Sequence, residues 1–174
     1  MPDAGISINR VLRRLAACVL MLGSAAPASA QLANCTPDDF SSVPIRFDVD
    51  FASEIQPIFQ ARCANCHISN SSGGLSLAPA GALSNLVNVP SVNANAGMPR
   101  VTPGNPLQSF LFGKVNCTNL NAIAGTPFGL RMPRNATTIT LAQQALLFDW
   151  IAAGALAAPG TPEIISRLGF ETGR

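Results

Sequence analysis

Residues 63 to 67 contain the most reactive combination of side chains in the chain. Cys63, Cys66 and His67 form a Cys-x-x-Cys-His pattern. Two thiols three residues apart can each form a thioether with one vinyl group of a haem, and the adjacent imidazole then lies below the iron. Attachment and proximal ligation thus come from one short segment. We therefore predict one covalently attached haem c, bound through Cys63 and Cys66 and ligated by His67.

Three other interpretations of this motif stay open at this point. Cys63 and Cys66 could form a disulfide, or they could act as a thioredoxin-like redox pair. The redox pair normally lies in a βαβ context, which the sequence does not predict. A zinc site would need a fourth strong ligand besides Cys63, Cys66 and His67.

His67 is the only histidine in the chain. A haem with two histidine ligands is therefore excluded, as is a second haem attached by the same motif. A peroxidase that relies on a distal histidine is disfavoured for the same reason. A thioether is the simplest sixth ligand, because histidine and methionine are the usual axial pair in cytochromes c.

Two methionines outside the first thirty residues could supply that thioether. Met98 and Met132 each precede a proline, which stiffens the segment in an extended form. We prefer Met132, because Thr140 is expected to cap a helix eight residues later and so to tether the ligand loop. Met98 has loop on both sides and is the second choice. An open sixth position and ordinary core packing of either methionine are the remaining alternatives.

Residues 1–30 resemble a secretory signal peptide. They contain three arginines, an apolar run over 15–22 and Ala28-Ser29-Ala30 as a small-residue cleavage site. The mature protein should begin near Gln31 and be exported to the periplasm or beyond. After Cys18 is removed with the signal, Cys35 and Cys117 remain beside the haem-binding pair. In an oxidising compartment we expect them to form a disulfide, with free or intermolecular thiols as the alternative.

Charge and hydropathy exclude several classes of partner. The whole chain has a net charge of +2, and removal of three arginines and one aspartate gives 8 − 8 = 0. A neutral chain has no basic stripe for nucleic acid. No stretch after residue 30 reaches the roughly 20 apolar residues of a membrane span. Four cations could meet the haem propionates, but a solvated surface charge is the better interpretation of each one, so none is assigned as a site: Arg100, Lys114, Arg131 and Arg134.

The periodicity predicts an all-α protein with long loops, and neither a repeat nor a convincing strand is present. Ser53 and Gln56 form a capping-box pattern for a helix over 53–63. Thr140 and Gln143 repeat this pattern before a helix that Gly154 should stop. Further short helices are expected over 80–87, over 106–114 with Asn105 as its cap, and over 161–168. We divide the chain into a signal peptide (1–30), an irregular N-terminal arm (31–46), a haem-binding domain (47–155) and a C-terminal tail (156–174).

Several short motifs resemble those of the planctomycete-type cytochrome c domain, a branch of the class I monohaem cytochromes. They span about residues 51 to 155, and they are Ile58-Phe59, Cys63 to His67, Gly73-Gly74-Leu75-Ser76-Leu77, Val101 to Pro106 with Ser109 and Leu111, Met132-Pro133, and Leu141 with Trp150 to Ala155. Arg134 stands where the family often has a second proline, and the 31–46 arm has no counterpart.

The resemblance implies a small cytochrome c-like helical fold with long loops wrapped around one covalent haem. Cys63 and Cys66 would be the thioether sites, His67 the proximal ligand and Met132 the distal one. Trp150 and Ile151 would pack the last helix on the first. These implications agree with the interpretation drawn from the motif itself.

The expected function is outer-sphere transfer of single electrons between redox partner proteins. No substrate is transformed, so we expect an electron carrier and not an enzyme. One rival is a haem-based sensor or ligand-binding module with an open or displaceable sixth position. A second is an electron-relay subunit of a larger periplasmic oxidoreductase, and the weakest is a haemless structural or thiol-redox protein.

Overall fold

A computed structural model describes residues 35–124, 129–134 and 137–159. The predicted signal peptide (1–30) and the predicted short helix over 161–168 lie outside the described residues. Regular structure in the described part is helical, with three isolated β-bridges and no strand, which confirms the all-α prediction. In the same part of the chain no helix combines the length and apolarity needed to cross a membrane.

The first helix begins earlier than the sequence predicts. A π-helical turn, η1 (Phe51–Ile55), leads into α2 (Gln56–Arg62). Asp50 is the N-cap, since its carboxylate accepts a hydrogen bond from the Ser53 amide at 2.8 Å, and the Glu54 carboxylate accepts from the Asp50 amide at 3.0 Å. The prediction of Ser53 as the cap is therefore wrong. Asp50 and Glu54 satisfy the first amides between them, and Gln56 is left buried.

The middle of the chain consists of short elements joined by turns. They are α3 (Ala64–His67), η2 (Ser72–Gly74), α4 (Ala82–Leu86) and η3 (Asn95–Gly97). Helix α4 lies inside the range predicted for it, 80–87. The cluster of Asn, Ser and Gly over 69–74 follows the end of α3, as the composition indicates.

The helix predicted over 106–114 is divided in two. Asn105 caps the short 3₁₀ turn η4 (Pro106–Gln108), accepting from the Gln108 amide at 3.1 Å. Helix α5 (Phe110–Asn116) then starts after Ser109, which is extended and fully buried. The Ser109 hydroxyl accepts from the Thr102 amide at 2.9 Å and donates to the Asn105 carbonyl at 2.9 Å. These contacts interrupt the predicted helix at Ser109. A further four-residue helix, α6 (Leu120–Ile123), was not predicted.

Helix α7 (Leu141–Ala152) agrees with its prediction. The Thr140 hydroxyl accepts from the Gln143 amide at 3.2 Å, and the Gln143 side chain accepts from the Thr140 amide at 3.0 Å. This reciprocal pair is the predicted capping box. The helix ends just before Gly154, whose φ of 103° lies in the region that favours glycine.

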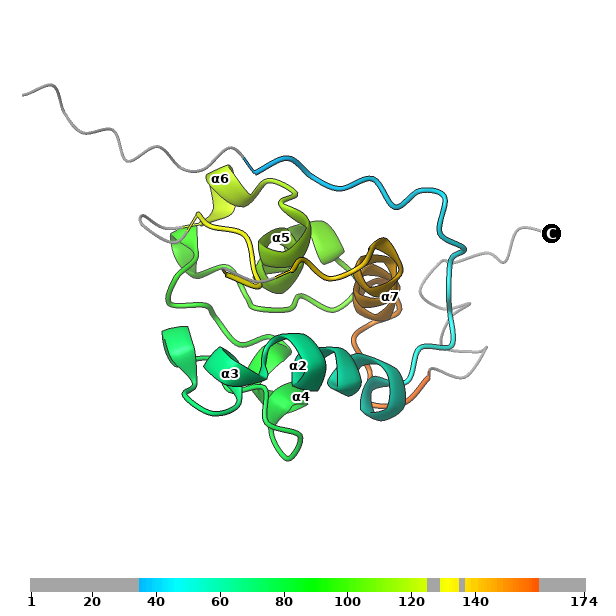
Figure 1. The fold of residues 1–174 in the computed structure, drawn as a ribbon, viewed down its shortest axis with the longest axis horizontal. Helices are drawn as coiled ribbons and strands as arrows, with labels where there is room; N and C mark the ends of the chain where they lie inside the picture. Colours follow the sequence, from blue (N-terminus) through cyan, green and yellow to red (C-terminus); the bar gives the residue numbers. More distant parts are fainter. Residues whose placement is uncertain (1–34, 125–128, 135–136, 160–174) are drawn as a thin grey trace, which may run out of the picture. The chain divides into compact units, whose positions relative to one another are not determined.

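Two groups of helices surround the main apolar cluster. Figure 1 shows α2, α3 and α4 on one side and α5, α6 and α7 on the other. Helix α7 contacts both α5 and η1. The Trp150 ring lies 5.2 Å from the Phe51 ring, centroid to centroid, and its Nε1 donates to the Leu156 carbonyl at 2.8 Å. Trp150 and Ile151 are fully buried, so the last helix packs on the start of the first.

The N-terminal arm is irregular over its described residues, 35–46, yet it is packed against the helices. The Phe40 ring lies 5.9 Å from that of Phe112 in α5 and 5.5 Å from that of Phe148 in α7. The Arg46 amide donates to the carboxylate of Asp149 at 2.8 Å. Figure 1 shows the arm (blue to cyan) running past α5 toward α7.

Trp150→Ala should lower the free energy of unfolding by about 3 to 5 kcal/mol, because it removes a fully buried aromatic side chain and leaves a cavity. Urea unfolding of the mature protein measures this change. Leu141→Ala on the same helix is the control, since Leu141 is 43% exposed and its loss should change little. Equal effects of the two substitutions would contradict this assignment of the core.

Candidate functional site

The Cys-x-x-Cys-His motif occupies the junction between α2 and α3. Cys63 ends α2, and its amide donates to the Phe59 carbonyl at 2.9 Å. Cys66 and His67 follow within α3, and the His67 amide donates to the Cys63 carbonyl at 2.9 Å. One helical turn thus carries all three side chains. Both thiols are free, with Cys63 half-buried and Cys66 exposed.

Cys63 and Cys66 have different surroundings. Burial, and to a smaller extent the neighbouring Cys66, raises the pKa of the Cys63 thiol to about 11. Cys63 is therefore protonated at neutral pH and is a poor nucleophile without assistance.

The His67 ring is oriented by the loop that follows it. Its Nδ1 lies 3.4 Å from the Leu75 carbonyl oxygen. A proton on Nδ1 would be donated to this carbonyl, which leaves the Nε2 lone pair for a metal. The same loop returns to the helix through the Leu77 amide, which donates to the His67 carbonyl at 2.7 Å. The Leu77 carbonyl in turn accepts from the Gln56 side chain at 2.9 Å.

Arg100 is a buried cation beside this loop. Its guanidinium donates to the Gly74 carbonyl and to the Asn85 carbonyl, each at 2.7 Å. Burial lowers the pKa of Arg100. No carboxylate of the described residues forms an ion pair with it. Arg100 therefore fixes the residue that precedes Leu75, and with it the carbonyl that faces His67.

Met132 lies on a short segment, 129–134, that is hydrogen-bonded to α5. The Met132 amide donates to the Lys114 carbonyl at 2.7 Å, and Arg131 Nε donates to the Val115 carbonyl at 2.9 Å. Lys114 Nζ donates to the Leu130 carbonyl. The Met132 side chain is half-buried. The tether that the structure describes is thus to α5, whereas the sequence suggested a tether to the start of α7.

Met98 has different surroundings. It packs against a second, smaller apolar cluster made of Phe110, Leu120 and Ala124, next to Cys35. This placement agrees with the gap-filling role that thioethers often have.

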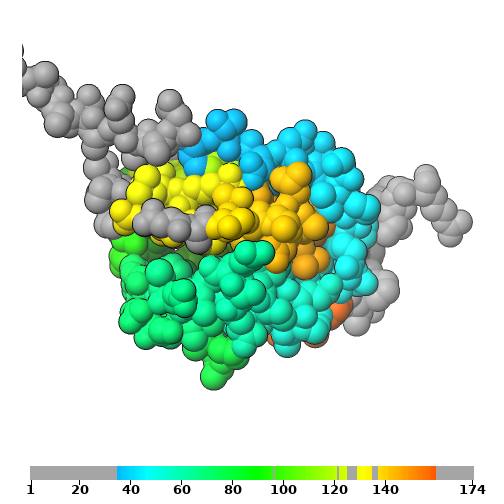
Figure 2. All heavy atoms as spheres, viewed as in Figure 1, coloured from blue at the N-terminus to red at the C-terminus, as the bar shows by residue number. Residues whose placement is uncertain are grey.

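The 129–134 segment, which carries Met132, shares one face of the molecule with α2 and α3, as Figure 2 shows (yellow, and teal to green).

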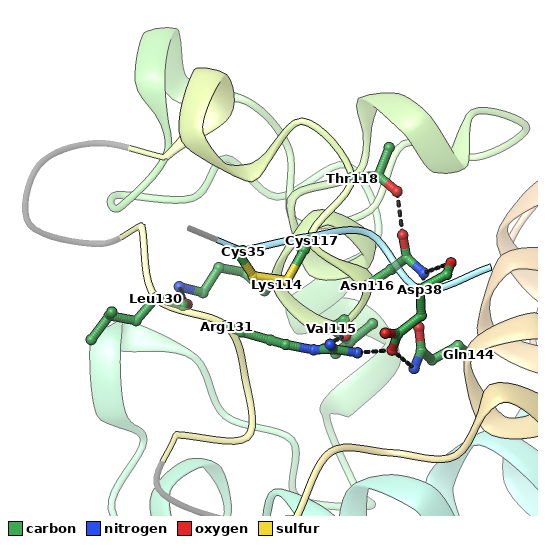
Figure 3. The surroundings of a disulfide bond; sticks show 10 residues. All are labelled: Cys35, Asp38, Lys114, Val115, Asn116, Cys117, Thr118, Leu130, Arg131 and Gln144. Carbon is green, nitrogen blue, oxygen red and sulfur yellow. Dashed lines mark hydrogen bonds and ion pairs between the residues drawn. A yellow bond between two sulfur atoms is a disulfide. The ribbon is translucent and has the colours of Figure 1, made fainter. Parts of the chain in front are cut away.

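A disulfide connects the arm to the end of α5, and a polar network connects it to the 129–134 segment (Figure 3). Cys35 and Cys117 are joined with their Cα atoms 5.4 Å apart, which is the pairing predicted from the sequence. The Asp38 carboxylate accepts from the Arg131 guanidinium and from the Gln144 side chain. Asp38 and Gln144 were not predicted. The sequence contained a sign of the role of Gln144 only, because it is a polar residue on the apolar face of α7.

The four cations considered for haem propionates are placed differently. Arg100 is buried, Arg131 pairs with Asp38, and Arg134 is exposed. Burial, and then the charge of Arg134, lowers the pKa of Lys114 to about 8. Only Arg100 combines burial with a position next to the Cys-x-x-Cys-His loop.

Comparisons with protein-family models, with curated proteins and with solved structures found no match for this chain. The resemblance to planctomycete-type cytochromes therefore stays a prediction.

The described residues contain no group of three or more His, Cys, Asp and Glu side chains that could hold a metal ion. The strands of a βαβ unit are also missing from this part of the chain.

Asp38 gives the site a pH-dependent contribution to stability. The hydrogen bond from Arg131, and to a smaller extent the one from Gln144, lowers the pKa of the Asp38 carboxyl. A lowered folded-state pKa stabilises the protein above the unfolded-state value, and this contribution is lost as pH falls through the folded-state value. The difference in unfolding free energy between the wild type and Asp38→Asn should be constant near neutral pH and shrink below about pH 4. Urea unfolding across this range measures it, and a difference that persisted undiminished to about pH 2 would contradict the assignment.

Proposed function

We propose that this protein is an exported monohaem c-type cytochrome that carries single electrons between redox partner proteins. One observation carries the proposal. Two free thiols and an imidazole lie on a single helical turn, and Nδ1 of that imidazole faces a backbone carbonyl. This arrangement suits two thioether bonds and one axial ligand.

The chemistry of the donor set fits haem c. Cys35 and Cys117 are joined to each other, which leaves Cys63 and Cys66 as the free thiols of the described residues. Arg100 adds a buried positive charge next to the loop that orients His67, and such a charge suits an acidic haem propionate. When bound, haem would supply a one-electron couple between ferrous and ferric iron.

The protein's own residues would hold the two axial positions. His67 is restrained through its ring by Leu75 and through its carbonyl by Leu77. Met132 is the proposed distal ligand, since its own amide and the side chain of Arg131 are hydrogen-bonded to α5. Met98 is the less favoured ligand because it packs in the second apolar cluster. Fixed ligands favour electron transfer, because little rearrangement accompanies a change of charge.

The surface favours docking through apolar contact. Only 11% of the residues are charged, against about 25% in an average domain. Steering by long-range charge would then be weak, and apolar contact would contribute most of the binding. We propose redox proteins as the partners, with no transformation of a substrate by this chain.

Covalent attachment should depend on one pair of cysteines only. Protein matured with haem-attachment machinery should give a positive pyridine haemochrome test and the mass of the chain plus one haem. Replacement of both Cys63 and Cys66 by serine should abolish both signals, because no thioether can form. The matched control is the replacement of Cys35 and Cys117 by serine, which should retain the haem. A colourless wild type with the mass of the bare chain would end the proposal.

The distal ligand should be identified by its absorbance. Ferric protein with methionine ligation has a sulfur-to-iron charge-transfer band in the near infrared. Met132→Ala should abolish this band and Met98→Ala should leave it in place, because only Met132 is proposed to reach the iron. Rapid binding of carbon monoxide to the reduced wild type would instead indicate a sensor or ligand-binding module.

A further inference from the structure

We infer that Asp38, in the N-terminal arm, is a positioning residue for the distal ligand Met132. The inference rests on the proposed function, since it concerns the same haem site. Asp38 does not touch Met132. It acts through Arg131, which is the neighbour of Met132 in the chain, and through Gln144 of α7.

Three separate parts of the chain meet at the Asp38 carboxylate. Oδ2 accepts a charge-assisted hydrogen bond from Arg131 Nη2 in the 129–134 segment. The same oxygen accepts from Gln144 Nε2 in α7 at 2.7 Å. Figure 3 shows the Arg131 and Gln144 side chains approaching this carboxylate from different elements. A charged acceptor makes such bonds about twice as strong as neutral ones.

Arg131 passes this restraint to Met132. Its Nη2 is held by Asp38 while its Nε donates to the Val115 carbonyl at 2.9 Å. The guanidinium is therefore fixed in two directions by groups from the arm and from α5. The next residue, Met132, donates its amide to the Lys114 carbonyl at 2.7 Å. Movement of Met132 away from α5 would have to break contacts of both residues.

Asp38 is itself held in place by α5. Its carbonyl accepts from the Asn116 side chain at 2.9 Å, and its amide donates to the Asn116 carbonyl at 3.3 Å. Asn116 also donates to the Gln144 side chain at 2.8 Å. Asn116 and Gln144 are fully buried, so water cannot easily replace their lost partners. The Cys35–Cys117 disulfide closes the arm onto the end of α5 three residues before Asp38.

Asp38→Ala should therefore loosen the Met132 segment without touching the haem motif. The substitution leaves Arg131 Nη2 and Gln144 Nε2 without their common acceptor. We expect the sulfur-to-iron band of the ferric protein to weaken or disappear. Carbon monoxide should bind the reduced protein about tenfold faster or more, because the distal ligand detaches more often. Hydrogen exchange of the Met132 amide should accelerate by a similar factor.

Asp39→Ala is the matched control. Asp39 carries the same charge in the next position, but its carboxylate accepts from the Ser41 amide at the exposed surface. It should leave the band, the carbon monoxide kinetics and the Met132 amide unchanged. The band and the carbon monoxide kinetics are measured on folded protein well below the melting temperature. For hydrogen exchange, the Met132 amide is compared with the amide of buried Trp150 in α7, because a general loss of stability would accelerate both amides whereas a local loosening accelerates only that of Met132. If Asp38→Ala does not yield folded protein, Asp38→Asn removes the charge while it preserves the shape and the backbone contacts.

The outcomes separate this inference from the proposed function. A wild type that has the sulfur band, loses it in Met132→Ala and keeps it fully in both Asp38 variants overturns the inference alone. A haem-containing wild type without the band overturns Met132 ligation and the inference together. Weakened bands in the Asp38 variants with an unchanged Asp39→Ala establish the positioning role.

Discussion

The geometry of the candidate site depends on a loop that folds back onto the helical turn carrying Cys63, Cys66 and His67. A turn that ends in a histidine does not by itself fix the imidazole. The restraint comes from Leu75 on the ring and from Leu77 on the backbone. Both belong to a loop without regular structure, and side-chain donors hold that loop at two points. Gln56 binds the Leu77 carbonyl and Arg100 binds the Gly74 carbonyl. The Gln56 contact is fully buried and competes with no solvent, whereas the Arg100 contact is part-buried because Gly74 lies at the surface.

The segment that carries Met132 is also held by hydrogen bonds between side chains and loop backbone, with different residues as partners. Segment 129–134 carries Met132 and contains no helix or strand of its own. Its position is set by hydrogen bonds to α5 and to Asp38 of the arm. Asp38 is in turn bound by Asn116 of α5 and Gln144 of α7, and both of these side chains are fully buried. The arm is therefore connected to the segment that carries Met132, although it lacks a counterpart in the family that the motifs resemble. Phe40 extends this attachment into the apolar core between Phe112 and Phe148.

The sequence predicted correctly those structural features whose stabilising contacts join residues close together in the chain. The Thr140 and Gln143 capping box was predicted because its two partners lie three residues apart and both contacts are internal to the first turn of α7. The same pattern misplaced the first helix, since Ser53 and Gln56 have the right spacing but Asp50 provides the stronger acceptor. The helix over 106–114 is interrupted at Ser109, whose hydroxyl accepts from Thr102, outside the predicted helix. The contacts of Asp38 span 93 and 106 residues of sequence, so no window along the chain could contain them.

The Cys-x-x-Cys-His motif depends on neighbouring residues in the sequence, whereas the placement of Met132 depends on residues far away in it. The Cys-x-x-Cys-His motif is five contiguous residues, and the helix supplies its geometry, so the sequence alone could identify it as a candidate site. For the proposed distal ligand the sequence favoured Met132 over Met98 on a predicted tether to the start of α7, whereas the described tether is to α5, because the contacts around each methionine come from distant parts of the chain. Met98 packs with Phe110 and Leu120 in an apolar cluster, whereas the backbone of Met132 is fixed by partners from α5. Only 11% of the residues are charged, and a few buried polar side chains fix the loops in their place. An unmade hydrogen bond at such a group costs about 1 to 3 kcal/mol, so each network strongly favours one arrangement of the segments that it joins.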